Sequence, residues 1–149
     1  MARVLIAWEL GEAFGHLARC LRLAEGLVAR GHTVTLALKD VRLPAGQRLG
    51  SGLTVLPAPL SPQAGAGGRA PVNYTDVLRV CGFANAQDVA ALLNAWRGIH
   101  TLARPDVLVA DHAPTALLAA IEQCFLAARE DVLPRPGNDT REPRKACLH

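Results

Sequence analysis

The first forty residues of the chain constrain its fold more than any other segment. Residues 4–8 (VLIAW) are a short apolar run with β-branched members, which predicts a buried strand. The apolar residues of 16–30 recur at helical spacing, and Gly31 then ends that helix. Residues 33–38 are the next predicted strand. A strand, a helix and a strand within this length form a βαβ unit, whose strands are parallel and whose crossover is almost always right-handed.

The rest of the chain extends this unit. The further predicted elements are two strands, over residues 53–56 and 107–110, and three helices, over residues 74–83, 87–104 and from Pro114 to about Ala128. Residues 57–71 are a long loop rich in Pro, Gly and Ala. We therefore expect an α/β protein with a Rossmann-like parallel sheet of order 3-2-1-4 and helices on both faces, over residues 1–128. Residues 129–149 are charged, rich in proline and without apolar periodicity, which predicts a disordered or irregular tail.

Composition excludes several classes of function. The net charge is only +3, and Lys and Arg are scattered, so nucleic-acid binding is not expected. The four cysteines stand far apart without a C-x-x-C pair, so we expect neither a metal site nor a redox motif, but free thiols in a cytoplasmic protein. The apolar run at residues 4–8 is too short for a signal peptide or a transmembrane segment.

The predicted topology brings two distant segments together. In a doubly wound sheet, ligands bind beyond the carboxyl ends of the strands, where the strand order reverses. That point lies here between the first and fourth strands. The segment after the first strand carries Gly11, Gly15 and His16, and the segment after the fourth carries Asp111 and His112. A carboxylate beside an imidazole orients it and fixes its tautomer, which suits the ring to activate a hydroxyl nucleophile.

Each of these residues also has a purely structural interpretation. His16 could simply start a helix, and Asp111 could cap the helix that opens near Pro114. Their shared place at the switch point favours a functional pair instead. His112 competes with Asp111 for the same role. Because side chains alternate around a strand end, we expect only one of the two to face the crevice, and we favour Asp111.

The glycines leave one alternative open. Gly11 and Gly15 lack the G-x-G-x-x-G spacing of a dinucleotide fingerprint, and they are expected to let the backbone approach a ligand closely. Asp40 follows the second predicted strand, where an acidic ribose ligand would stand in a nucleotide-dependent oxidoreductase. That class of enzyme is the generic alternative for such a fold.

Two stretches resemble the GT-B glycosyltransferases. They are RVLIAWELGEAFGHLARCLRLAEGLVARGHTVTLAL, with its glycine-His loop and a helix of the type LxLAxxLxxRGH, and RPDVLVADHAPTALLAA. The resemblance spans roughly Arg3 to Ala120. It is shared with the UDP-glycosyltransferases of natural products and with the lipid-linked N-acetylglucosaminyltransferases of peptidoglycan synthesis. In that family the first-loop His deprotonates the acceptor hydroxyl and an Asp after the fourth strand supports it, which implies these roles for His16 and Asp111.

The resemblance implies an acceptor-binding half of an enzyme that moves a sugar from a nucleotide-sugar donor to a hydroxyl acceptor, either a small molecule or lipid-linked. Gly11, Gly15 and His112 are then the candidate substrate-binding residues, and no cofactor is expected. After Ala120 the chain resembles neither the family's next strand nor its nucleotide-binding domain. We expect a truncated or frame-shifted product, or one subunit of a split enzyme with a donor-binding partner chain. The chain alone is expected to be inactive. A non-catalytic partner subunit or binding module is the other alternative.

Overall fold

The computed structural model describes residues 1–11, 14–43, 50–61 and 72–132 of the 149-residue chain. Four parallel strands form one sheet: β1 (Arg3–Trp8), β2 (Thr33–Leu38), β3 (Leu53–Pro57) and β4 (Val107–Asp111). Their spatial order is β3-β2-β1-β4, which confirms the predicted order and the α/β fold class. Because β1 is central, Trp8 at its carboxyl end is paired with Leu38 on one side and with Asp111 on the other.

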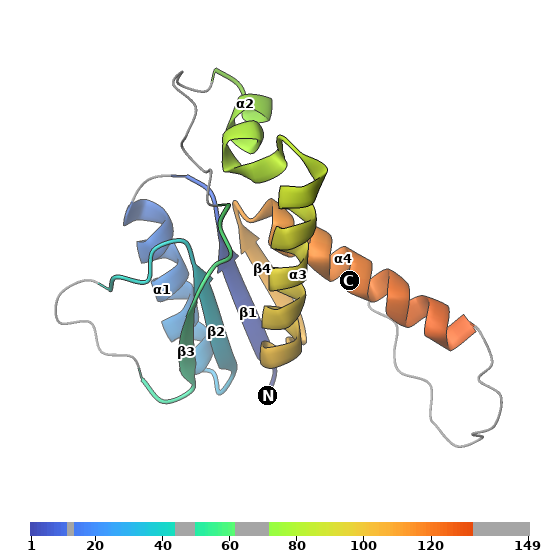
Figure 1. Cartoon of the computed structure of the whole chain (residues 1–149). Helices are drawn as coiled ribbons and strands as arrows, with labels where there is room; N and C mark the ends of the chain where they lie inside the picture. The colour runs from blue at the N-terminus through green and yellow to red at the C-terminus, as the bar shows by residue number, and fades with distance from the viewer. Residues whose placement is uncertain (12–13, 44–49, 62–71, 133–149) are drawn as a thin grey trace.

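Helices cover both faces of the sheet, as predicted (Figure 1). One face carries α1 (Phe14–Val28), and the other carries α3 (Ala86–Ala103) and α4 (Pro114–Val132). The short helix α2 (Tyr74–Leu78) lies beyond the carboxyl ends of the strands and continues into a π-helical turn, η1 (Arg79–Phe83).

The continuous apolar run of β1 is explained by burial on both faces. Alternate side chains of the strand point to opposite sides. One set packs against α1 in the cluster Val4, Ile6, Trp8, Leu17, Cys20, Leu21 and Ala24, together with residues of β2. The other set packs against α3 and against small residues in and just before α4, in a cluster that includes Leu5, Ala7, Trp96, Ala113, Ala116 and Ala119. The alanines allow α4 to lie close to the sheet.

Three boundaries differ from the sequence prediction. Helix α1 begins at Phe14 rather than at His16, so Gly15 belongs to its first turn and not to the preceding turn. The helix expected over residues 74–83 is interrupted, because Gly82 has a φ of 105°, which does not fit a helix. Helix α4 runs to Val132 rather than ending near Ala128, and residues 133–149 of the expected tail lie outside the described residues. Most of the predicted loop, residues 62–71, lies outside them as well.

Strand β4 forms one edge of the sheet, and its first residue, Val107, is half exposed. Leu117, Leu118 and Ile121 on the neighbouring α4 are also exposed. Within the described ranges, no helix is both long and apolar enough to cross a membrane.

Candidate functional site

The carboxyl ends of β1 and β4 hold the two candidate segments against each other. Beyond the last pair of the ladder, Trp8 with Asp111, the backbone N–H of Leu10 donates to the carbonyl of His112 at 3.0 Å. On the other side of β1, the N–H of Lys39 donates to the carbonyl of Trp8 at 2.8 Å. The turn that leaves β1 is thus fixed by backbone hydrogen bonds on both sides.

His16 and Asp111 meet in this region. His16 Nδ1 lies 3.0 Å from Asp111 Oδ2, although the two residues are far apart in the sequence. Both side chains are mostly buried, with 23% and 17% of their surface exposed. Because a carboxylate only accepts, the ring nitrogen in this bond, Nδ1, carries a proton. In a neutral ring Nε2 then keeps its lone pair, which is the tautomer that a general base requires.

Two further residues of α1 contact the same carboxylate. Arg19 Nη1 donates to both Asp111 oxygens, at 3.2 and 3.4 Å, and Cys20 Sγ lies 3.9 Å from Oδ2. Burial, reinforced by the charge of Asp111, raises the pKa of the Cys20 thiol to about 11. Cys20 is therefore a neutral thiol and not a nucleophile. The sequence reasoning missed both residues, although their spacing of three and four from His16 places all three on one helical face.

A column of four aromatic rings crosses the site. Trp8 stacks on His16 with ring centroids 5.6 Å apart, His16 on His112 at 6.0 Å, and His112 on Tyr74 of α2 at 5.7 Å. The expectation that only one of Asp111 and His112 faces the crevice was wrong. His112 has a φ of 56°, in the left-handed region, and it lies just past the strand, so the alternation of strand side chains no longer applies to it.

The two candidate glycines have different surroundings. Gly11 has a φ of 91°, and a Cβ there would lie 3.1 Å from His16 Nε2 and 3.4 Å from His112 Nδ1. Its carbonyl accepts a hydrogen bond from Lys39 Nζ at 3.0 Å. A Cβ on Gly15 would meet nothing within 4 Å, because this residue is exposed on the first turn of α1. Gly11 thus lies at the centre of the site, and a binding role for Gly15 stays a prediction.

Glu9 has a role that the sequence analysis did not foresee. The residue is only 3% exposed, and its carboxylate accepts hydrogen bonds from the backbone N–H groups of Thr115 and Ala116, at 3.1 and 2.6 Å, in the first turn of α4. Burial raises the pKa of Glu9, and the donors around it, including the Thr115 hydroxyl and the Trp96 indole, oppose that rise. Within the described residues neither of these two side-chain groups makes a hydrogen bond, so the backbone N–H groups of Thr115 and Ala116 hold the carboxylate.

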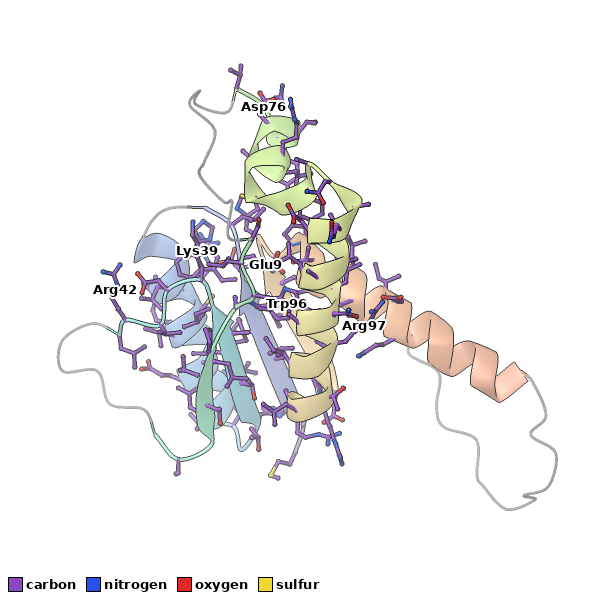
Figure 2. All side chains as sticks on the ribbon, viewed as in Figure 1. Glu9, Lys39, Arg42, Asp76, Trp96 and Arg97 are labelled. Atoms are coloured by element: carbon purple, nitrogen blue, oxygen red, sulfur yellow. The ribbon has the colours of Figure 1, made fainter. Side chains whose placement is uncertain are left out.

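Figure 2 shows Glu9 at the end of β1 and Trp96 on the adjacent α3. The free N–H groups at the start of α4 are thus met by Glu9, whereas Asp111 faces His16. The sequence did contain one indication of this role: Glu9 is an acidic residue directly after an apolar strand and just before a turn that contains glycine.

Asp40, the candidate ribose ligand of an oxidoreductase, is engaged elsewhere. Its carboxylate pairs with Arg42 at 2.6 Å, and the Arg42 guanidinium lowers the pKa of Asp40 to about 2. Lys39 beside it points back to the Gly11 carbonyl. Among the residues that the structure describes, no group of three or more His, Cys, Asp or Glu side chains could hold a metal ion.

Comparisons with known proteins give one structural neighbour. No protein-family model matches the chain. No curated protein matches it either. Among solved structures, apo UGT2 of Phytolacca americana, a UDP-glycosyltransferase, superimposes with a TM-score of 0.51 and 17% sequence identity. The match covers 96% of this chain and 36% of that one, so the chain spans about a third of the length of its neighbour. At this identity the likeness shows a shared fold.

Proposed function

We propose that this chain is the acceptor-binding part of a glycosyltransferase, in which His16 is the general base and Asp111 supports it. The observation that carries the proposal is the Nδ1–Oδ2 hydrogen bond of 3.0 Å at the switch point of the sheet, with His16 Nε2 beside Gly11. The glycosyltransferase-like fold and the sequence resemblance support the same reading.

The chemistry follows from this arrangement. An acceptor hydroxyl beside His16 Nε2 transfers its proton to the ring as its oxygen attacks the anomeric carbon of a nucleotide sugar. The bond from that carbon to the nucleotide diphosphate breaks, and the configuration at the carbon inverts. As His16 becomes positively charged, the Asp111 carboxylate stabilises it through the Nδ1–H bond. The groups that bind the donor and stabilise the departing diphosphate belong to a donor-binding partner chain or domain, so the chain alone is expected to transfer no sugar.

The tautomer of His16 can be measured without a donor. In the protein labelled with ¹⁵N, long-range proton–nitrogen spectra distinguish a protonated Nδ1 from a bare Nε2. We expect the Nδ1–H form of His16 in the wild-type chain and a mixture of tautomers in Asp111→Asn. His32 is the matched control, because its Nδ1 accepts from the Ala2 N–H and lies outside the site. A His16 ring with its proton on Nε2 would contradict the assignment of Nε2 as base.

Transfer itself is tested by reconstitution. The full chain is mixed with a separately produced nucleotide-sugar-binding domain of a glycosyltransferase, and product is detected by mass spectrometry with UDP-sugars and phenolic or sugar acceptors. His16→Ala should lower the rate by about a hundredfold or more, as for removal of a general base, and His32→Ala should leave it unchanged. Equal rates for wild type and His16→Ala would exclude His16 as base. Binding of NAD(P) in a separate titration would instead support the oxidoreductase alternative.

A further inference from the structure

The carboxylate of Asp111 is contacted by three residues of one helix. His16 Nδ1 lies 3.0 Å from Oδ2, Arg19 Nη1 donates to Oδ1 at 3.2 Å and to Oδ2 at 3.4 Å, and Cys20 Sγ lies 3.9 Å from Oδ2. The three residues are at positions i, i+3 and i+4 of α1, so they share one face of that helix. Asp111 itself ends β4, an edge strand. These contacts therefore join α1 to the end of β4 through side chains.

The two oxygens of Asp111 have different partners. Oδ2 accepts the proton of His16 Nδ1, and among the described residues Arg19 is the donor to Oδ1. A carboxyl group that is held at one oxygen can still turn about its last side-chain torsion, which has broad minima. A contact at the second oxygen restricts that rotation. Arg19 therefore helps to determine the direction in which Oδ2 faces His16.

The start of α4 does not compete for this carboxylate. An Asp that follows a strand and precedes a helix is a common helix cap. Here Glu9 already accepts from the N–H groups of Thr115 and Ala116 in the first turn of α4. Pro114, the first residue of that helix, has no N–H to offer. The Asp111 carboxylate is thus left for the side chains of α1.

The exposure of the ion pair indicates how Arg19 acts. The Arg19 side chain is 65% exposed and that of Asp111 only 17%. Solvent screens the charge of so exposed a guanidinium, so its electrostatic effect on the site is small. Its contacts with both carboxylate oxygens still restrict their orientation. If Arg19 acted by charge alone, it would share the negative charge of Asp111 and weaken the bond to His16, which is the opposite effect.

We propose that Arg19 is a positioning residue for the general base: its guanidinium holds the Asp111 carboxylate in the orientation that keeps Oδ2 on His16 Nδ1. The role of His16 as a base rests on the proposed function. Without Arg19 the carboxylate is free to turn, and the hydrogen bond to Nδ1 opens more often. The His16 ring then spends less time in the tautomer and orientation that a base requires.

The opening of this hydrogen bond is measured by proton exchange in the ¹⁵N-labelled full chain. The His16 Nδ1 proton exchanges with water at a rate that rises with the fraction of time for which the bond is open. Arg19→Met keeps a long, unbranched side chain with a similar helix propensity, and we expect it to raise this rate about twofold to fivefold, as for loss of an exposed ion pair. Arg19→Lys keeps a charged donor, so its rate should stay within about twofold of wild type. An unchanged or slower exchange in Arg19→Met would overturn the proposal.

Two controls separate this role from a general loosening of the fold. Arg22→Met removes the same type of side chain from α1, where Arg22 Nε donates to the Ala18 carbonyl at 3.4 Å, and it should leave the His16 exchange rate unchanged. The backbone N–H of Ile6, in the central strand β1, reports on opening of the whole sheet and should exchange at the wild-type rate in every variant. A similar rise in Arg22→Met, or a parallel rise at Ile6, would contradict a specific role of Arg19. Equal rises in Arg19→Met and Arg19→Lys would also contradict it.

Sugar transfer gives a second readout in the reconstituted reaction. Arg19→Met should lower kcat by about the same twofold to fivefold and leave the KM for the acceptor unchanged, because Arg19 acts through Asp111 and not on the acceptor. A wild-type kcat in Arg19→Met, in a reaction that still depends on His16, would refute the role of Arg19. If wild type transfers no sugar, the proposed function fails, and the exchange rates decide the role of Arg19 on their own.

Discussion

Replacement of Glu9 by Ala is the sharpest test of how the site is held together. The Glu9 carboxylate is buried and accepts from two backbone N–H groups at the start of α4, at 3.1 and 2.6 Å. The change leaves both donors buried without an acceptor. Each unsatisfied donor costs about 1–3 kcal/mol. Removal of a helix cap costs about 0.5–2 kcal/mol, but this describes the same hydrogen bonds and is not added to the first cost. The cost of burying the carboxylate is relieved in return. We therefore expect a net loss of about 2–4 kcal/mol in the free energy of unfolding.

The measurement is urea unfolding followed by circular dichroism, with Asn85→Ala as the control. Asn85 caps α3 by accepting from the Asp88 N–H at 2.8 Å, but it is exposed, so its removal should cost only about 1 kcal/mol. A Glu9→Ala protein within about 0.5 kcal/mol of wild type would refute the reasoning, because this is the range of ordinary surface substitutions.

The pH dependence of the same residue adds an independent check. Burial raises the pKa of Glu9 above its usual value of 4.5. A group with a raised folded-state pKa contributes stability below its unfolded pKa and loses that contribution as pH rises through the folded value. The stability of wild type relative to Glu9→Gln should therefore be greatest below pH 4.5 and decrease as the pH rises through the folded-state pKa of Glu9. If the stability of wild type relative to Glu9→Gln grew with pH instead, the backbone N–H donors, and not burial, would determine the pKa of Glu9.

Two further predictions concern a thiol and a glycine. Because the Cys20 pKa is about 11, on the order of one thiol in a thousand is ionised at pH 8, so peptide mass spectrometry should find Cys20 alkylated by iodoacetamide far more slowly than the exposed Cys124; equal rates would contradict its burial. Gly82→Ala should cost about 2 kcal/mol or more in urea unfolding, because Gly82 has a φ of 105° and a Cβ would lie 2.7 Å from Ser61 Cβ. Gly98→Ala, inside α3 with nothing within 4 Å, should stabilise by about 0.5–1 kcal/mol, and a loss there would show that helix propensity does not govern this position.

The arrangement of the sheet was predictable because its strands have strong and simple patterns. An apolar run such as that of β1, followed by a helix with one apolar face and a second apolar run, has few alternatives to a right-handed βαβ unit. Once the order β3-β2-β1-β4 is given, His16 and Asp111 must follow adjacent strands. Their proximity is a consequence of topology, and the hydrogen bond of 3.0 Å agrees with it.

The parts that could not be predicted depend on backbone angles and on local packing. The left-handed conformation of His112 accompanies the hydrogen bond from the Leu10 N–H to its carbonyl, and no pattern in the sequence encodes a positive φ at a histidine. Likewise, the interruption after α2 comes from Gly82. The helical periodicity of the sequence is compatible with a glycine at this position, but its observed φ of 105° is not helical. Glu9 could equally have been an exposed turn residue. Its burial is decided by the nearby start of α4, more than a hundred positions later in the chain.

Glu9 and Asp111 are two carboxylates at the ends of adjacent strands, and they have different roles. Glu9 points to the backbone amides of α4, with 3% of its surface exposed, and so it fixes structure. Asp111 faces two side chains instead, the imidazole of His16 and the guanidinium of Arg19. Glu9 is also adjacent to Leu10, whose N–H holds the His112 carbonyl. Loss of the Glu9 contacts should therefore loosen the turn that carries Gly11 as well as α4, and the spacing of the His16 and His112 rings depends on that turn. Glu9 is therefore a positioning residue, which acts on the two rings through the turn that it holds against α4.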